Sequence, residues 1–376
     1  MKSAIPLPDR SLASPRTRFD AVYRMLDDAI AAHAFPGCAF GVLALSSTGS
    51  EIVFQDALGC FTYDEGAPLV TPETVYDVAS LTKVAATTAA AMLLWQRGQL
   101  DLETPLVDLL PGFVVGRAPG DLARQVKLSH LLAHNSGLPG YVEFFRTAAT
   151  PAALFRACLE LPLEAEPGSR AAYSDPGFIL LGKALEVLTR EYLAPWVGHE
   201  IFEPLGLSAT GFCPPPTVRP AIPPTEEDTT LRHRLIQGEV QDENAWLLKG
   251  AAGHAGLFSN VPDLLRFAAE ILRAGSNTGK PGLFDPATVE RFAQRQGPEG
   301  SSRALGWDTP SANSSSGRHF SPRSIGHLGF SGCSLWIDRD AGIAVTLLTN
   351  RTWRDRQSHL IREVRPAFHD AVREAL

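Results

Sequence analysis

The sequence predicts an α+β fold, in which an antiparallel β-sheet is flanked by terminal helices and interrupted by a large inserted helical region. Two observations lead to this prediction. Strand-like runs occur near both ends of the chain, and the stretch between them, from about residue 98 to 295, is mostly helical in pattern. The two sets of strands must pair with one another, because neither set alone makes a sheet with a covered face.

These patterns predict a flexible N-terminal lead over residues 1–17, a sheet region formed by 18–97 and 296–376, and a mostly helical region over 98–295. A length of 376 residues allows one large domain or two ordinary ones. We treat the two regions as one catalytic unit, with the site in the crevice between them.

The first elements are a helix and a hairpin. The stretch "RFDAVYRMLDDAIAAHAF" places Phe19, Val22, Leu26 and Ile30 at helical spacing. The apolar runs "CAFGVLALSS" and "EIVFQDALGC" follow, separated by "STGS". Two strand-like runs split by such a turn sequence predict a β-hairpin.

The last elements are strands and a closing helix. "RALGWDT", "SIGHLGFSGCSLWIDRD" and "GIAVTLLTNR" are strand-like, with "RDAG" as the turn between the last two. "IREVRPAFHDAVREAL" is expected to close the chain as a helix. The helical stretch in between is broken by Pro/Gly loops such as "EAEPGSR".

The composition excludes several classes of function. The chain is 44% hydrophobic and 20% charged, as in a globular protein with a sizeable core. Its net charge is −7, from 34 basic and 41 acidic residues, with no dense Lys/Arg cluster, so we expect neither nucleic acid nor an anionic membrane as a partner. The five cysteines are scattered without a C-x-x-C pair, which indicates neither a disulfide framework nor a zinc site.

The N-terminal "MKSAIPLPDRSLASPRTRFD" has no apolar core of the kind a secretory signal needs, and no run of the chain is long and apolar enough to span a membrane. We therefore expect a cytoplasmic location, or a periplasmic one if the sequence lacks a natural leader. The sequence does not indicate an oligomeric state.

The stretch "DVASLTKVAATT" contains the first candidate for chemistry. Ser80 and Lys83 are three residues apart at the start of an apolar helix, so they share a face and the lysine amine can reach the serine hydroxyl. A serine nucleophile needs such a base, and burial can lower a lysine pKa enough for it to accept a proton. Alone the pattern is weak, because roughly 0.4 such S-x-x-K matches are expected by chance.

Two further stretches strengthen the interpretation of Ser80 and Lys83 as a catalytic pair. "AAYSDPGFILLGKALEVL" presents Tyr173-Ser174-Asp175 just before an apolar helix, and "IGHLGFSGCSLWI" presents His327-Leu328-Gly329 at the start of a strand. In this order, the three elements resemble the serine β-lactamase and penicillin-binding-protein superfamily. The nearest branches are class C β-lactamases, D-alanyl-D-alanine carboxypeptidases and family VIII esterases, and the likeness covers about residues 18 to 350.

The resemblance implies a β-lactamase/transpeptidase-like fold, no cofactor and no metal, and a small ester, amide or lactam as substrate. It implies that Ser80 is the nucleophile that forms an acyl-enzyme, with Lys83 as its base partner and Tyr173 as proton relay. It also implies an oxyanion hole formed by the backbone N–H groups of Ser80 and Phe330.

The remaining residues carried over by the resemblance form the substrate-binding side: Asp175, His327, Leu328, Gly329 and, as a candidate, His254. Asp175 stands where the family more often has Asn, and as a carboxylate it can only accept hydrogen bonds. It would hold Lys83 more firmly as an ammonium. His327-Leu328 replaces the Lys-Thr of a Lys-Thr-Gly motif, which weakens binding of a substrate carboxylate and favours esters.

Three alternatives stay open. A Ser-Asp-Asn register would make Ser174 the proton shuttle in place of Tyr173. His130 and His134 have zincin spacing, but Leu131 replaces the glutamate of H-E-x-x-H, so a hydrogen-bonded helix end is favoured over a metal site. The sequence is equally compatible with two roles for His254, one lining the site and one in packing. The acidic "DEN" at 242–244 is interpreted as a hydrogen-bonded loop in preference to an acid–base group.

The sequence thus predicts a serine acyl hydrolase that acts on an ester, D-amino-acid peptide or β-lactam carbonyl. Two other functions remain: a non-hydrolytic penicillin-binding or ligand-sensing protein on the same fold, and a metallohydrolase built on the histidines. The absence of G-x-S-x-G gives no support to a nucleophile-elbow hydrolase.

Overall fold

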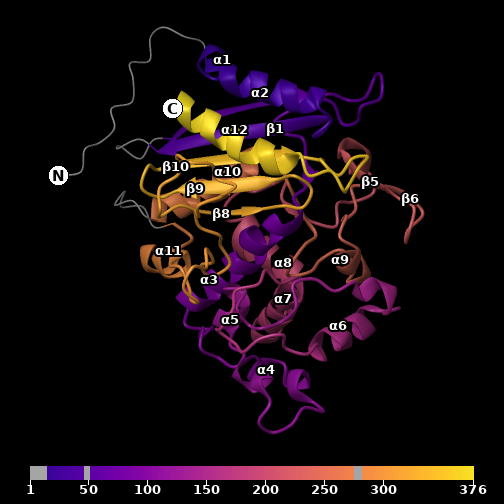
Figure 1. The fold of residues 1–376 in the computed structure, drawn as a ribbon, viewed down its shortest axis with the longest axis vertical. Coiled ribbons are helices and arrows are strands. Elements are labelled where there is room, and N and C mark those ends of the chain that lie inside the picture. The colour runs from indigo at the N-terminus through magenta and orange to yellow at the C-terminus, as the bar shows by residue number, and fades with distance from the viewer. Residues whose placement is uncertain (1–14, 46–50, 275–281) are drawn as a thin grey trace, which may run out of the picture.

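The computed structural model describes residues 15–45, 51–274 and 282–376, and its main sheet is antiparallel throughout. The strand order is β2-β1-β10-β9-β8 (Figure 1). These strands are β1 Gly37–Leu45, β2 Glu51–Gly59, β8 Ile325–Leu328, β9 Ser334–Asp338 and β10 Ile343–Thr349. The pairing of β1 with β10 confirms that the strands from the two ends of the chain form one sheet.

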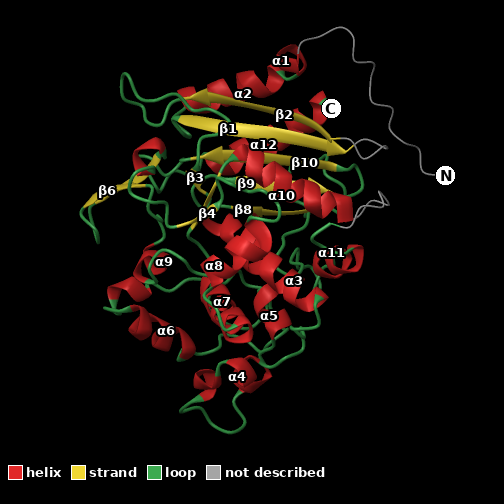
Figure 2. Ribbon diagram, turned by 180° about the vertical axis from the view of Figure 1, so that it is seen from behind, coloured by secondary structure: helices red, strands yellow, loops and turns green. Residues whose placement is uncertain are grey.

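Helices cover both faces of this sheet. On one face lie α2 Asp20–Ala31 and the C-terminal α12 Ile361–Ala375, and on the other lies α10 Val261–Ala274 (Figures 1 and 2). Strand β1 is buried along most of its length, because its side chains alternate between two apolar layers. Phe40 packs in the layer of α2 and α12, whereas Leu43 packs in the layer of α10.

The helical region below the sheet follows the chain from the Ser80 segment onward (Figure 2). Its α-helices are α3 Ala89–Gln96, α4 Leu106–Leu109, α5 Leu128–Leu132, α6 Pro151–Leu159, α7 Asp175–Thr189, α8 Leu193–Val197, α9 Glu243–Leu247 and α11 Pro286–Ala293. Two small antiparallel sheets accompany them. The first has the order β3-β7-β4, with β3 Tyr76–Asp77, β7 Leu257–Ser259 and β4 Gly211–Phe212, and the second pairs β5 Pro224–Asp228 with β6 Arg234–Gln237.

The structure refines several of the sequence expectations. The predicted first helix is α2, whereas the "STGS" turn and residues 1–14 of the expected lead lie outside the described residues, and α1 occupies Pro15–Arg18. Residues 303–309 form two isolated bridges instead of the strand that we expected. Helix α10 lies within the range 98–295, yet it packs against the sheet.

His327-Leu328-Gly329 was expected at the start of a strand, and this expectation is wrong. His327 and Leu328 are the last residues of β8, and a turn over 329–333 separates β8 from β9. Gly332 lies in this turn with a φ of +109°, a left-handed conformation that a strand does not adopt but that glycine permits. The apolar run "SIGHLGFSGCSLWIDRD" is therefore two strands and a turn.

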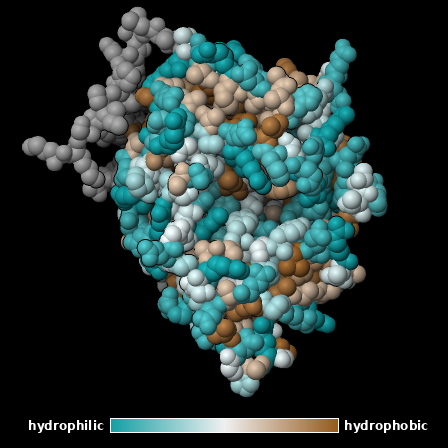
Figure 3. Space-filling model, viewed as in Figure 1, coloured by the Kyte–Doolittle hydropathy of each residue, from teal (hydrophilic) through white to brown (hydrophobic). Residues whose placement is uncertain are grey.

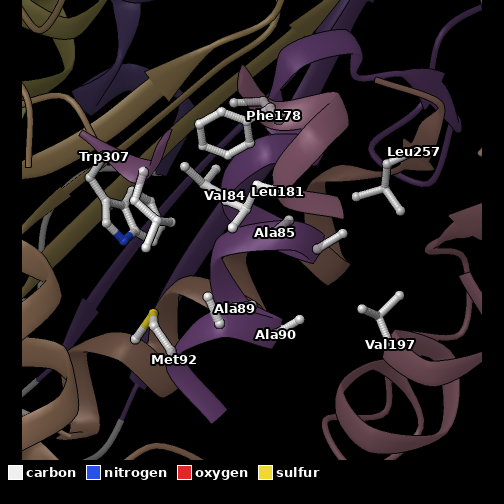
Figure 4. Packing of buried hydrophobic residues seen from close by; sticks show 14 of the residues in the cluster. Val84, Ala85, Ala89, Ala90, Met92, Phe178, Leu181, Val197, Leu257 and Trp307 are labelled. Atoms are coloured by element: carbon white, nitrogen blue, oxygen red, sulfur yellow. The ribbon is translucent and has the colours of Figure 1, made fainter. Parts of the chain in front are cut away.

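The core of the helical region surrounds the helix that begins near Ser80. The segment Lys83–Thr88 is π-helical and continues into α3. Figure 4 shows Ala85, Ala89 and Ala90 along this helix, with Phe178 of α7 beside its first turns. Small side chains let neighbouring backbone segments approach closely, so the start of this helix is deeply enclosed.

Within the described ranges, no helix combines the length and the apolar character that crossing a bilayer requires. On the face shown in Figure 3, hydrophilic side chains predominate and hydrophobic ones form small, separated groups.

We predict that Phe368→Ala on α12 lowers the free energy of unfolding by about 3–5 kcal/mol, because it opens a cavity between helix and sheet. Phe368 is fully buried, and its ring meets that of Phe40 edge-on at 5.8 Å. Urea denaturation followed by circular dichroism measures the change. Val115→Ala, at a position 76% exposed, is the control and should change it by less than about 0.5 kcal/mol. Equal effects of the two substitutions would contradict the proposed packing.

Candidate active site

Ser80 lies in a strained turn between β3 and the helix that follows. It is the middle residue of a 3₁₀ turn, Ala79–Leu81, in which Ala79 has a φ of +47°. This conformation is unfavourable for alanine. It is held by the buried Asp77, whose Oδ1 accepts a hydrogen bond from the Ala79 N–H at 2.9 Å, and by Thr82, whose hydroxyl donates to the Ala79 carbonyl at 2.6 Å.

The Ser80 hydroxyl oxygen accepts hydrogen bonds from two side chains. Lys83 Nζ donates to it at 2.9 Å, and the Tyr173 hydroxyl donates at 2.7 Å. The first contact comes from the local helical geometry, as predicted. The second joins residues 93 positions apart, because the loop before α7 passes directly over the Ser80 turn.

Lys83 is completely buried, and its amine contacts a hydroxyl, a backbone carbonyl and a carboxylate. Besides Ser80, the Nζ donates to the carbonyl of His254 at 2.9 Å and forms an ion pair with Asp175 Oδ1 at 2.8 Å. It also lies 4.8 Å from the centre of the Tyr173 ring. Burial lowers the pKa of Lys83, but the Asp175 charge and the nearby Tyr173 outweigh this effect and raise the pKa above its ordinary value.

This raised pKa corrects one sequence expectation and agrees with another. A lowered Lys83 pKa was expected from burial, and this expectation is wrong, because the counter-charge of Asp175 and the nearby Tyr173 outweigh the effect of burial. The expectation that Asp175 holds the lysine as an ammonium agrees with the geometry. Burial also raises the pKa of Tyr173, against the opposing effect of Lys83. Both groups are therefore protonated at neutral pH.

Tyr173, and not the neighbouring Ser174, points toward Ser80. The buried Ser174 hydroxyl donates to the Pro139 carbonyl at 2.7 Å and accepts from the Gly177 N–H at 3.1 Å, which caps the start of α7. This placement disfavours the register that would make Ser174 the proton shuttle.

A cleft of about 310 Å³ opens above Ser80. It is lined by Ser80, Tyr173, Arg303, Asp308, His327, Leu328, Gly329, Phe330, Arg351, His359, Ile361, Arg362 and Arg365. The structure thus brings the serine, the tyrosine and the end of β8 together.

The imidazole of His327 is a neutral group in the wall of this cleft. Burial, together with the charges of Lys83 and Arg303, holds its pKa well below the usual range. Its Nδ1 donates to the Leu328 carbonyl at 2.8 Å, and its buried Nε2 has no hydrogen-bond partner in the described part of the chain. His327 therefore offers a hydrogen-bond acceptor, not a cation, to whatever occupies the cleft.

The turn after β8 packs directly against the segment that precedes Ser80. A Cβ at Gly329 would lie 2.4 Å from the Val78 carbonyl oxygen, so only glycine permits this approach. Phe330 follows, and no acceptor among the described residues takes a hydrogen bond from its N–H or from that of Ser80. Ser80 and Phe330 both line the cleft, so their N–H groups remain the predicted donors of an oxyanion hole.

The His254 side chain is not among the residues that line the cleft, and it forms a hydrogen bond within the protein. Its Nε2 lies 2.9 Å from Asp242 Oδ1, and Asp242 also caps α9 by accepting from the Ala245 N–H. Burial raises the pKa of Asp242, but His254 and the Ala245 N–H bring it down to about 2. His254 thus contributes its backbone carbonyl to Lys83. The loop expected at "DEN" is instead the start of a helix, because Asp242 caps α9 and Glu243 and Asn244 are its first residues.

The two histidines with zincin spacing serve separate hydrogen bonds. His130 Nδ1 accepts from the Lys127 N–H at 3.2 Å, and His134 Nδ1 accepts from the Ser174 N–H at 3.0 Å. Over residues 15–45, 51–274 and 282–376, no three His, Cys, Asp or Glu side chains converge in a way that could hold a metal ion. The helix-end interpretation therefore fits both residues.

Sequence reasoning did not place several residues near Ser80 and Tyr173: His134 was named only for its zincin spacing, and the arginines were not named at all. The His134 ring lies 4.7 Å from the Tyr173 ring, and the Arg303 guanidinium lies 5.3 Å from it. Arg351, Arg362 and Arg365 form the wall beside Phe330. Their positions carry no local motif, because they are brought to Ser80 by loops and a helix far along the chain.

Comparisons with known proteins show the family of this chain. The family model described as Beta-lactamase matches residues 22–365. Proteins of Salmonella paratyphi B and Salmonella typhimurium, named "Putative D-alanyl-D-alanine carboxypeptidase", are 31% identical to this chain over 337 residues, which is 80% of this chain and 76% of theirs.

Solved structures share the fold over almost the whole chain. EstCE1, described as "a hydrolase with promiscuous acyltransferase activity", superposes with a TM-score of 0.75 at 24% identity over 95% of this chain and 99% of its own. Simvastatin synthase (LovD) from Aspergillus terreus gives 0.72 at 19% over 96% and 98%. A penicillin-binding protein homologue from Pyrococcus abyssi gives 0.68 at 20% over 88% and 73%.

We predict that Asp175→Asn lowers the pKa of Lys83 by about 1–3 units, because burial remains while the opposite charge is lost. A ¹⁵N NMR titration of the lysine side chains measures the shift, and the spectrum of Lys83→Met identifies the signal. Glu186→Gln, which removes the partner of the more exposed Lys183, is the matched control and should leave Lys83 unchanged. An unshifted Lys83 in Asp175→Asn would refute the dominance of this ion pair.

Proposed function

The chain belongs to the beta-lactamase family, and from this premise we propose that it is a serine acyl hydrolase that forms a covalent acyl-enzyme on Ser80. The proposed substrates are molecules with an ester, D-amino-acid peptide or β-lactam carbonyl, and esters are favoured among them. The proposal assigns no role to a cofactor.

One observation carries this proposal: a single serine hydroxyl oxygen accepts from both Lys83 and Tyr173 inside a cleft bordered by two backbone donors. Serine attacks a carbonyl only when a neighbouring group takes its proton, and the attack is accelerated when N–H groups face the developing oxyanion. The arrangement contains a nucleophile, a route for its proton and donors for the oxyanion.

The raised pKa values define the first step. In the resting site Lys83 and Tyr173 are both protonated, so this pair must release one proton to solvent before it can act as a base. The deprotonated pair then takes the Ser80 proton while Oγ bonds to the substrate carbonyl carbon. The carbonyl oxygen becomes an oxyanion facing the N–H groups of Ser80 and Phe330.

In the second half of the reaction, the pair passes on the proton that it took from Ser80. The tetrahedral intermediate collapses as the bond to the leaving group breaks, and Tyr173 passes the proton to the leaving oxygen or nitrogen. Water attacks the carbonyl carbon of the acyl-enzyme and gives a proton to the pair. The second tetrahedral intermediate collapses as the bond to Ser80 Oγ breaks, and the pair passes that proton to Oγ, which restores Ser80 and releases the carboxylic acid. The pair is again ready to accept a proton.

The two side chains at the end of β8, and not the arginines elsewhere in the cleft wall, support an ester in preference to a substrate that needs its carboxylate bound there. His327 is neutral and Leu328 is aliphatic, so these two side chains offer no cation and no hydroxyl to a carboxylate. EstCE1 is described by acyl transfer as well as hydrolysis, and the Salmonella relatives are named for D-alanyl-D-alanine cleavage. These descriptions support the reaction class, in which an acyl group is transferred to water or to another acceptor.

A non-hydrolytic penicillin-binding protein is the second candidate, and one observation favours it. Asp175 stabilises the protonated form of Lys83 at 2.8 Å, which withholds the base from both acylation and deacylation. A strained β-lactam carbonyl is more reactive than the acyl-enzyme ester, so the second step is slowed to a rate below the first. A protein of this kind would become acylated by a β-lactam and stay so.

We expect Ser80→Ala to reduce hydrolysis of a p-nitrophenyl short-chain ester by about 10³-fold or more, because the variant lacks the hydroxyl that both Lys83 and Tyr173 contact. Release of p-nitrophenol, with and without EDTA, measures it, and Ser311→Ala on an exposed loop is the serine control. Stable labelling by a fluorescent penicillin without ester turnover would support the second candidate. Full activity of Ser80→Ala would rule out the proposed mechanism.

The electrostatics also predict the pH dependence. We expect kcat/KM of the wild type to rise into the alkaline range, because the base forms only when the Lys83–Tyr173 pair loses a proton. Asp175→Asn lowers the Lys83 pKa, so the rising limb should move to lower pH by about 1–3 units. Rates with the same ester across the acid and alkaline ranges test this, and a limb that stays in place would show that Asp175 does not control the base.

A further inference from the structure

Arg365, on α12, is a buried guanidinium whose hydrogen bonds go to carbonyl oxygens. It is 6% exposed and donates from Nη2 to the carbonyls of Gly329 at 2.5 Å and Cys333 at 2.9 Å, and from Nε to that of Gly332 at 3.2 Å. No described carboxylate forms an ion pair with it. Burial lowers its pKa to about 10, so it is still a cation at neutral pH.

Such a cation is costly to maintain. Removing a charge from water is strongly unfavourable, and no carboxylate of the described residues compensates for it here. Arg373 on the same helix shows the ordinary arrangement, with its guanidinium 3.4 Å from the carboxylate of Asp338. The difference between two arginines of one helix indicates that Arg365 is needed for the turn that it contacts.

The most important of these contacts is on the peptide unit that carries the proposed oxyanion donor. The carbonyl of Gly329 and the N–H of Phe330 belong to the same planar amide. They point in opposite directions, so a donor fixed on the carbonyl side directs the N–H toward the opposite side. Since Gly329 also packs against Val78 beside Ser80, that N–H direction is set relative to the nucleophile.

A charged donor also changes the electronic character of this amide. A hydrogen bond from a cation is stronger than one from a neutral group, and hydrogen bonds in a chain polarise one another. Electron density drawn toward the Gly329 oxygen leaves the Phe330 N–H a better donor. The effect grows in a buried site, where water does not screen the charge.

The next peptide unit is held by a second arginine. Arg351 Nε donates to the Phe330 carbonyl at 2.7 Å, and its guanidinium lies 4.3 Å from the centre of the Phe330 ring. Thus the carbonyl before the Phe330 α-carbon, that of Gly329, and the carbonyl after it, that of Phe330, each accept a hydrogen bond from a guanidinium group of another element. Arg365 acts on the amide with the reactive N–H, and Arg351 on the amide that follows.

We propose that Arg365 is a positioning residue for the oxyanion hole: through the Gly329 carbonyl it aims and polarises the Phe330 N–H. This inference rests on the proposed serine acyl hydrolase, since it assigns a task in that reaction. It predicts that the loss of Arg365 weakens stabilisation of the transition state more than binding of the substrate.

The test compares Arg365→Met and Arg365→Lys with Arg373→Met, which removes another largely buried arginine from the same helix outside the cleft. For each variant, kcat and KM are measured with the p-nitrophenyl ester, and urea denaturation reports its stability. Infrared difference spectra of the acyl-enzyme, with a ¹³C-labelled carbonyl, report how strongly that carbonyl is polarised. Ser80→Ala is measured in parallel.

We expect Arg365→Met to lower kcat by about 10- to 100-fold, less than the loss of a direct oxyanion donor, with KM changed by no more than about threefold. The acyl carbonyl stretch should move to higher wavenumber. Arg365→Lys should fall between wild type and Arg365→Met, because an ammonium keeps the charge but not the planar fork. Arg373→Met should keep the wild-type kcat and carbonyl frequency.

Three results would overturn the inference: an unchanged kcat and carbonyl frequency in folded Arg365→Met, an effect on KM alone, or the same losses in Arg373→Met. If Arg365→Met does not fold, kcat, KM and the acyl carbonyl stretch of Arg365→Lys provide the test. A wild-type carbonyl frequency in Arg365→Lys would then overturn the proposal. An inactive Ser80→Ala beside an unaffected Arg365→Met would refute only this inference. An active Ser80→Ala would refute the proposed function itself.

Discussion

The buried ammonium of Lys83 is the constraint on which the candidate active site depends. A charge with no access to water must be paired and hydrogen-bonded, and Lys83 takes its partners from three separate parts of the chain. They are the Ser80 hydroxyl in the turn before its own helix, the Asp175 carboxylate at the start of α7, and the His254 carbonyl in the loop before β7. Moving any one of them leaves the charge less well compensated, so the cation holds these segments in one arrangement.

This convergence requires backbone segments to lie very close together, which explains the small residues around the site. A Cβ at Gly253 would lie 2.2 Å from the Phe178 carbonyl oxygen, and one at Gly182 would lie 3.0 Å from the Gly253 Cα. Thr87 donates to the Gly253 carbonyl at 2.7 Å and ties the same loop to the Lys83 helix. The alanines of that helix, seen in Figure 4, leave room for α7.

The same charges shape the chemistry that the cleft supports. Asp175 stabilises the protonated lysine, and burial keeps Tyr173 protonated and His327 neutral. The resting site is therefore a cation bound to a serine, and its base forms only when the Lys83–Tyr173 pair loses a proton. The end of β8 adds a neutral wall to this site.

Spacing along the chain was enough to predict the features that depend on local geometry. Apolar runs at both ends predicted the antiparallel sheet, and the three-residue interval of Ser80 and Lys83 predicted their contact, because such residues share one helical face. Tyr173 was found through its likeness to a family motif, since nothing local connects it to a serine 93 residues away. The ionisation of Lys83 could be established only from the folded chain, because it is the balance between burial and the charge of Asp175. The role inferred for Arg365 also depends on the fold, since packing of α12 against the sheet brings its guanidinium to a turn 36 residues earlier.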